Sequence, residues 1–175
     1  MKKISAKYLE LQIELHNNPN YGVASIGIAP DIKEFFKAAK FKSISDYGAG
    51  KKNLFHALTK IGLKDFEYYA YDPVFPEYGP PKSGDLVCCI DVLEHIEEEY
   101  IENVLDDLKN ITDKIGFFTI ATGPAEKILA DGRNAHLIQR PSNWWLMKMC
   151  ERFEIEHLQK NSGGFLIIVK SKAFV

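Results

Sequence analysis

Residues 43–50 read SISDYGAG, and they decide the fold. A short extended run reaches Asp46, and a turn with two glycines, Gly48 and Gly50, follows it. Glycine has no Cβ, so it permits the sharp passage from strand to helix and lets a ligand contact the backbone. Apolar residues then recur at helical spacing until Gly62. The stretch therefore predicts a strand, a glycine turn and a helix, which together start an α/β fold.

Further strands on both sides of this unit extend it into a sheet. Residues 66–71 form an extended run that ends before Pro73, and the residue before a proline is disfavoured in a helix. Residues 86–90, LVCCI, are continuously apolar, as in a parallel strand that is covered on both faces. Residues 115–121 predict another buried strand. Strands that alternate with helices are typical of a parallel sheet.

The two ends of the chain complete the expected architecture. An amphipathic helix is predicted near the N-terminus and a second one after Pro30, and these helices make residues 1–42 a helical lead-in. At the other end, residues 154–158 and 165–169 flank a turn with two glycines and predict a hairpin. We expect one domain over 1–175, with a doubly wound, Rossmann-like α/β fold and a mostly parallel sheet that ends in an antiparallel hairpin strand.

Composition limits the classes of function. The 175 residues include 22 Lys and Arg against 24 Asp and Glu, a formal charge of −2, so no overall positive field attracts nucleic acid, which is not a predicted partner. Three cysteines cannot form a closed disulfide framework, which favours a reducing compartment. No apolar stretch approaches the ~18 residues of a membrane span. We expect a cytoplasmic protein with no membrane partner.

The ends of the predicted strands should carry the chemistry, because ligands of open α/β sheets bind at the carboxyl edge. Asp72 ends the second strand, where a carboxylate can accept the hydroxyls of a ribose. This arrangement suits either NAD or S-adenosylmethionine. A dinucleotide fingerprint needs a third glycine where this chain has Asn53. In addition, Asp46, Asp91 and Glu94 would repel a pyrophosphate but attract an ammonium and a sulfonium, so the charges favour the cationic cofactor.

Two motifs resemble one family. Residues 45–50 resemble the cofactor loop of class I S-adenosylmethionine-dependent methyltransferases, and residues 85–96, DLVCCIDVLEHI, resemble their fourth-strand motif. With Asp72 and the terminal hairpin, the resemblance covers roughly residues 43–170. Residues 131–145 resemble a group of small bacterial and phage members. The resemblance implies S-adenosylmethionine as cofactor, with binding residues Asp46, Tyr47, Gly48, Ala49, Gly50, Asp72, Pro73, Asp91 and Val92.

One departure from the family pattern concerns the third strand. Family members place a helix and a third strand between the ribose acid and the fourth strand, but Asp72 and Asp85 are only 13 positions apart. Pro76, Pro80 and Pro81 in this gap also oppose helix and central strand. We therefore expect the third strand and its helix to be missing. We also expect the loop over 74–83 to form an irregular wall over the adenine.

The acceptor side of the site is predicted on the loop after residues 115–121, which leaves a strand at the ligand edge. His136 could act as a base, since histidine titrates near neutral pH, or be a hydrogen-bonded loop residue. Asp131 and His136 lack a third ligand at recognisable spacing, so no metal site is predicted. The other predicted substrate-binding residues are Glu94, Arg133, Asn134 and Trp144.

The leading prediction is a methyltransferase that acts on an O or N nucleophile of a small-molecule or sugar-like acceptor. The alternatives are a non-catalytic S-adenosylmethionine-binding module and then a nicotinamide-dependent oxidoreductase. The sequence carries no prediction of oligomeric state.

Overall fold

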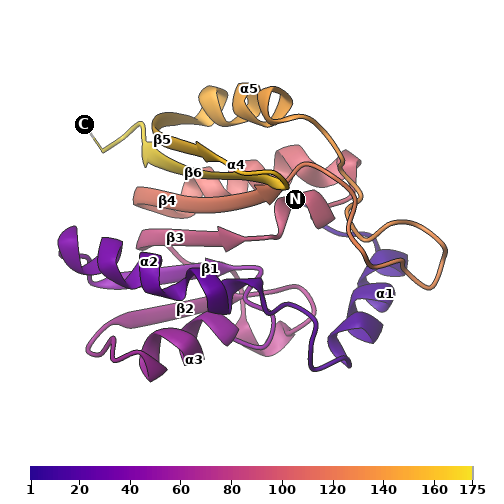
Figure 1. The fold of residues 1–175 in the computed structure, drawn as a ribbon, viewed down its shortest axis with the longest axis horizontal. Coiled ribbons are helices and arrows are strands. Elements are labelled where there is room, and N and C mark those ends of the chain that lie inside the picture. Colours follow the sequence, from indigo (N-terminus) through magenta and orange to yellow (C-terminus); the bar gives the residue numbers. More distant parts are fainter. Residues whose placement is uncertain (175) are drawn as a thin grey trace.

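The computed structural model describes residues 1–174, which contain a six-stranded sheet in the order β2-β1-β3-β4-β6-β5. Strands β2, β1, β3 and β4 are parallel, and β6 runs antiparallel to both β4 and β5. The predicted α/β class with an antiparallel terminal hairpin is therefore confirmed (Figure 1). The strands are β1 (Ser43–Tyr47), β2 (Glu67–Tyr71), β3 (Gly84–Ile90), β4 (Thr112–Ala121), β5 (Phe153–Lys160) and β6 (Gly164–Ser171).

The predicted absence of a third family strand is also confirmed. Between Tyr71 and Gly84 the described chain forms only a short 3-10 helix, η1 (Pro76–Tyr78). Strand β2 is consequently the edge of the sheet. The prolines of this segment cannot donate to a strand ladder, which explains why the chain passes directly to β3.

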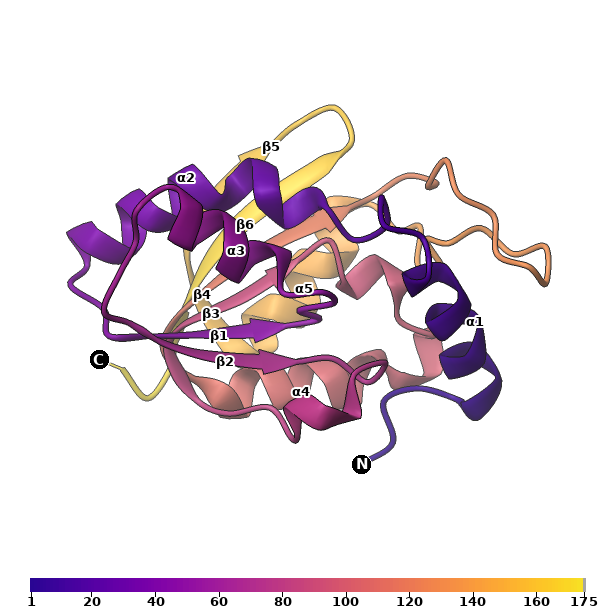
Figure 2. The ribbon, with the colours of Figure 1, turned by 90° about the horizontal axis from the view of Figure 1, so that it is seen from below.

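Helices cover both faces of the sheet (Figures 1 and 2). Alternate side chains of β3 show the two faces: Val87 and Cys89 belong to one core cluster, and Leu86 and Cys88 belong to the other. All four are fully buried, as the continuous apolar run predicts. The helices are α2 (Ala24–Ala38) and α3 (Asn53–Lys60) on one face, and α4 (Ile101–Ile111) and α5 (Ser142–Arg152) on the other, with the short 3-10 helices η2 (Leu93–His95) and η3 (Glu98–Tyr100) before α4. No helix within 1–174 has the length and apolarity needed to cross a membrane.

Helix α2 begins earlier than the sequence predicts. It was expected after Pro30, but it starts at Ala24 and contains Pro30. Proline removes one helical hydrogen bond, and here burial of Ala29, Ile32 and Phe36 on the sheet offsets that loss. As a result, the first turn of α2 reaches the carboxyl edge of the strands.

Helix α1 (Ala6–His16) lies beyond the carboxyl ends of the parallel strands (Figure 1). The loop over 122–141 packs on it: Leu129 and Ala135 of the loop form a small buried cluster with Tyr8 of α1. The hydroxyl of Tyr8 also donates to the backbone oxygen of His95. These contacts fix α1 over the edge of the sheet.

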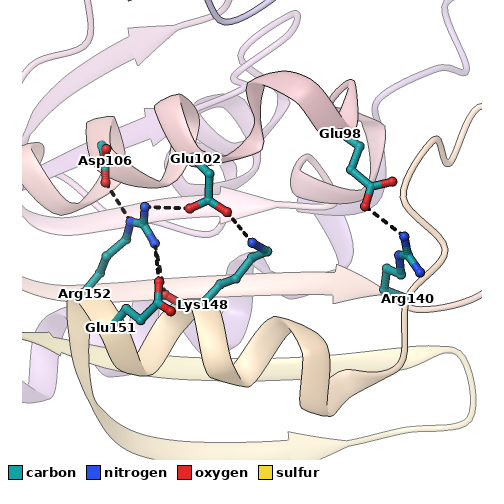
Figure 3. Close-up of polar contacts among 7 residues, drawn as sticks. All are labelled: Glu98, Glu102, Asp106, Arg140, Lys148, Glu151 and Arg152. Atoms are coloured by element: carbon teal, nitrogen blue, oxygen red, sulfur yellow. Dashed lines mark hydrogen bonds and ion pairs between the residues drawn. The ribbon is translucent and has the colours of Figure 1, made fainter.

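A row of charged side chains joins α4 to α5 (Figure 3). The guanidinium of Arg152 donates to Asp106 and to Glu102, each at 2.8 Å, and Lys148 also pairs with Glu102. The Arg152 side chain is only 10% exposed, whereas the acids are about half exposed, so solvent screens the pairs. The hydrogen bonds from Lys148 and Arg152 lower the pKa of Glu102.

We expect Arg152→Met to lower the free energy of unfolding by about 1 kcal/mol at neutral pH. A carboxylate with a lowered folded-state pKa contributes its stability above its unfolded pKa and loses it as the pH falls through the folded pKa. The difference from wild type should therefore shrink below about pH 4 and in 1 M salt. Urea unfolding checks this, with Arg140→Met as control, because the Arg140–Glu98 pair is exposed on both sides. A loss that is independent of pH and salt would contradict it.

Candidate active site

A cavity of about 320 Å³ lies where the parallel strands end, in the size range of small-molecule sites. The exits of β1, β2 and β3 form its floor, and α1 and the first turn of α2 form its cover. Every residue that the sequence predicts as cofactor-binding lines this cavity, namely Asp46, Tyr47, Gly48, Ala49, Gly50, Asp72, Pro73, Asp91 and Val92.

The glycine turn needs its glycines. Gly48 has φ +79° and Gly50 has φ +48°, a region that favours glycine. The N–H groups of Gly48 and Ala49 both donate to the backbone oxygen of Tyr71, at 2.8 and 2.9 Å, so the turn is tied to the end of β2. A Cβ on Gly48 would lie 2.4 Å from Cγ2 of Val92. The exits of β1 and β3 therefore pack together only because residue 48 has no side chain.

The carboxylate of Asp72 also fixes the glycine turn, through hydrogen bonds to backbone N–H groups. Its Oδ2 accepts the N–H of Gly50 at 2.9 Å, and its Oδ1 accepts the N–H of Val74 at 2.9 Å. Each carboxylate oxygen can accept a further hydrogen bond. Asp72 thus orders the turn and still has lone pairs for a ligand.

The site is acidic, and two of its acids, Asp46 and Asp72, are buried. Burial raises the pKa of Asp46 to about 7, although a hydrogen bond from Tyr68 opposes the shift. Burial also raises the pKa of Asp72. Asp91 adopts φ +57°, an uncommon conformation for a residue with a side chain, and lines the cavity beside them. A ligand cation would stabilise the ionised forms of Asp46 and Asp72.

Two stacked rings of the shortened segment stand beside the glycine turn. The rings of Phe75 and Tyr78 are 5.3 Å apart and nearly parallel. The hydroxyl of Tyr78 donates to the backbone oxygen of Gly50, and the ring of Phe75 packs edge-on against His16. Of residues 74–83, Val74 lines the cavity, and the segment contains a 3-10 turn; that it walls an adenine stays a prediction.

Sequence reasoning missed the contribution of α1. Tyr8, Gln12 and His16 follow one another at intervals of four, so they share one helix face, and all three line the cavity. The sequence contained a signal for this, because Gln12 lies on the apolar face of the predicted helix. In the structure Gln12 is only 8% exposed. A polar side chain at such a position indicates a buried polar network.

His16 closes the cavity above the glycine turn. Its ring lies edge-on to Tyr21 at 5.0 Å, and its Cε1 would be 3.1 Å from a Cβ on Gly50. Its Nδ1 is buried and has no hydrogen-bond partner within the described chain. Burial lowers the pKa of His16, so the neutral imidazole is favoured, against the opposing charge of Asp72.

The residues predicted for the acceptor side do not line the cavity. Asn134 holds the loop together by bonding Ala125 with both its oxygen and its nitrogen, and Arg133 pairs with Asp131. Trp144 packs against the core on α5.

His136 donates Nδ1–H to the backbone oxygen of Gly123. Its ring packs edge-on against the ring of His95, with ring centres 4.8 Å apart, and His95 does line the cavity. The role of His136 in catalysis stays a prediction.

Glu94, the fifth residue predicted for the acceptor side, is fully buried. Its Oε1 accepts the N–H of Ala121 at 2.7 Å, whereas its Oε2 has no partner among residues 1–174. Burial first, and then the charge of Asp91, raise the pKa of Glu94 well above its usual value. Burial thus favours the protonated form of Glu94, which joins η2 to the end of β4.

We expect Glu94→Gln to stabilise the protein at pH 8, because glutamine has the shape of the neutral acid and needs no proton. A carboxyl with a raised folded-state pKa contributes stability below its unfolded pKa and loses it as the pH rises towards the folded pKa. Each unit of that shift corresponds to about 1.4 kcal/mol. The stability difference between Glu94→Gln and wild type should vanish as the pH falls below about 4, where the Glu94 side chain is protonated even in the unfolded wild-type chain. Thermal unfolding across this range measures it, and a variant that is less stable than wild type at pH 8 would contradict the assignment.

Comparison with known proteins supports the fold by structure alone. No protein-family model and no curated protein matches the sequence. The structure is similar to 1,6-didemethyltoxoflavin-N1-methyltransferase of Burkholderia thailandensis, solved with S-adenosylhomocysteine, with a TM-score of 0.63, 12% identity and coverage of 98% of this chain and 92% of that one. For magnesium protoporphyrin IX methyltransferase of Synechocystis PCC 6803, the TM-score is 0.57 at 11% identity, with 95% of each chain covered.

A third similar structure is longer than this chain. It is an O-methyltransferase family protein from Burkholderia thailandensis, with a TM-score of 0.59 at 9% identity. The match covers 93% of this chain and only 58% of that protein.

Proposed function

We propose that this chain, which has the fold of class I S-adenosylmethionine-dependent methyltransferases, binds S-adenosylmethionine and transfers its methyl group to an oxygen or nitrogen of a small molecule. One observation carries the proposal: a glycine turn and three acids, Asp46, Asp72 and Asp91, meet in one cavity at the ends of three parallel strands. Such a site attracts a ligand that bears a sulfonium and an ammonium and repels a pyrophosphate.

The residues present fit this cofactor. Gly48 and Gly50 leave the backbone accessible beside the methionine portion, and the remaining lone pairs of Asp72 can accept the two ribose hydroxyls. Asp46 and Asp91 supply negative charge near the amino acid portion. When bound, S-adenosylmethionine supplies a methyl group attached to a positively charged sulfur.

Residues 74–78 take over the role of the missing strand in this proposal. Val74 lines the cavity next to Asp72, and Phe75, which follows Val74 in the chain, stacks on Tyr78. An apolar wall at this position suits a planar adenine.

The whole described chain acts as one domain in this proposal. Residues 1–42, the helical lead-in, supply the cover of the site, since α1 and the first turn of α2 line the cavity. The cover excludes water from the transfer, which strengthens the electrostatic interactions inside.

The transfer itself requires little of the protein beyond alignment and proton removal. A lone pair of the acceptor forms the new bond to the methyl carbon while the carbon–sulfur bond breaks and leaves its electrons on sulfur. The acceptor then loses one proton to a base or to solvent. His136, the predicted base, lies one ring away from the cavity wall, behind His95.

A transfer assay tests the proposal. Purified protein is incubated with S-adenosylmethionine carrying tritium in the methyl group and with fractions of a bacterial small-molecule extract. Wild type should move label into at least one fraction and release S-adenosylhomocysteine in equal amount, whereas Asp72→Ala should not. Tight binding of the cofactor without transfer to any fraction would favour the non-catalytic binding module, and reduction of NAD by the extract would favour the oxidoreductase.

A further inference from the structure

One part of the cavity wall carries a hydrogen-bonded network that joins α1 to residues 21 and 95. Four side chains shape it: Tyr8, Gln12, Tyr21 and His95. They are joined by hydrogen bonds, from Tyr21 Oη to Gln12 Oε1 at 3.1 Å and from Gln12 Nε2 to Tyr8 Oη at 2.6 Å. Tyr8 Oη in turn donates to the backbone oxygen of His95 at 2.7 Å.

The direction of this hydrogen-bond chain is fixed at one end. A backbone carbonyl oxygen can only accept, so the single hydroxyl proton of Tyr8 is donated to the backbone oxygen of His95. Gln12 must therefore donate its amide N–H to Tyr8 and turn its amide oxygen towards Tyr21. Tyr21 must then donate its own proton to Gln12. The free lone pairs of Tyr21 Oη remain as acceptors.

His95 adds a second acceptor of the same kind. Its Nδ1–H donates to the backbone oxygen of Ala135 at 2.8 Å, which leaves Nε2 as the lone-pair nitrogen of a neutral ring. Burial lowers the pKa of His95 to about 4, so the ring stays neutral at physiological pH. Among these four side chains, one N–H of Gln12 is the donor still available.

The charged residues of the cavity wall as a whole disfavour an anion. The lysine in the cavity wall, Lys3, pairs with Asp107. Two cations of the loop over 122–141 lie on ring faces without lining the cavity, Lys127 over Tyr21 and Arg133 over Tyr8, and Arg133 also pairs with Asp131. The acids of the cavity wall are Asp46, Asp72, Asp91 and Glu97.

We propose that the acceptor binds beside this network, against Tyr21 and His95, and that it is a hydrogen-bond donor without an anionic group: a hydroxyl or amine on an apolar body. The inference rests on the proposed function, since it takes the glycine turn and the acids at the strand ends as the cofactor site. Tyr21 is the positioning residue: its hydroxyl oxygen accepts from the hydroxyl or amine that receives the methyl group. The rings of Tyr8 and Tyr21 pack against the apolar body.

Three probes with one body and different head groups test this: benzylamine, benzyl alcohol and benzoate. Each is titrated by NMR into protein saturated with S-adenosylhomocysteine. The amine and the alcohol should bind at least about tenfold more tightly than benzoate. Tyr21→Phe should weaken both by about 3- to 10-fold and leave the titration with S-adenosylhomocysteine unchanged, as expected for one lost hydrogen bond.

Tyr69→Phe is the matched control, because Tyr69 lies on the edge strand, outside the cavity lining, and its hydroxyl pairs with Glu67. Benzoate binding as tightly as the amine, Tyr21→Phe matching wild type with all three probes, or no probe binding to the loaded protein would each overturn the inference. Failure of S-adenosylhomocysteine itself to bind would instead overturn the proposed function and the inference with it.

Discussion

Gly48→Ala should reduce the affinity for S-adenosylmethionine at least about 100-fold. Residue 48 sits at φ +79°, where a residue with a Cβ costs roughly 1–2 kcal/mol. The added Cβ would also lie 2.4 Å from Val92 Cγ2, and such overpacking costs roughly 1–3 kcal/mol. The turn or the exit of β3 must shift to relieve the contact, and both form the floor of the cavity. About 3 kcal/mol corresponds to roughly a 100-fold loss.

The control for this substitution is Gly27→Ala, in the middle of α2. A Cβ there meets nothing within 4 Å, and alanine is favoured over glycine in a helix. This variant should bind the cofactor like wild type and unfold at a slightly higher temperature. In addition, Val92→Ala combined with Gly48→Ala should recover part of the lost stability, because it removes the two nearest methyl groups. Wild-type affinity in Gly48→Ala alone would show that the turn is not part of the binding site.

Asp72→Asn should weaken cofactor binding by about 10- to 100-fold. Asparagine keeps one oxygen but places an NH₂ group where the second oxygen accepts a backbone N–H, either that of Gly50 or that of Val74. A lost hydrogen bond to a charged group costs about 1.5–3 kcal/mol. The substitution therefore loosens the glycine turn and removes an acceptor for the ribose. Isothermal titration with S-adenosylhomocysteine measures the loss.

Asp85→Asn separates binding from stability. Asp85 also accepts a backbone N–H, that of Lys42, and it pairs with Lys114, but it lies at the opposite end of β3 from the cavity. It should lower the free energy of unfolding and leave cofactor affinity unchanged. Equal effects of Asp72→Asn and Asp85→Asn on affinity would mean that Asp72 acts through stability alone.

The floor of the site could be predicted from the sequence because its residues are local to strand ends. The glycine turn follows directly after β1, Asp72 directly after β2, and Asp91 directly after β3. In a parallel sheet these ends meet at one edge, so position in sequence predicts position in space. The missing strand could be predicted for the same reason, since chain length and proline content are local properties.

The cover of the site could not be predicted in this way. The position of α1 depends on contacts with residues far along the chain, such as Tyr8 with His95 and Ser5 with Glu97. The loop over 122–141 leaves β4 at the ligand edge, as expected, but its polar side chains bond to the loop itself. Its buried side chains instead support α1. Polar composition alone does not show whether a loop faces a ligand or holds itself together.

Calorimetric titration of the wild-type protein with S-adenosylmethionine, S-adenosylhomocysteine and NAD tests the central claim most directly. The acidic cavity and the glycine turn predict saturable 1:1 binding of the first two ligands and none of NAD. The same titrations with Gly48→Ala should lose the binding and with Gly27→Ala should keep it. Binding of NAD in preference to S-adenosylmethionine, or no binding of either S-adenosyl compound by folded protein, would contradict the account.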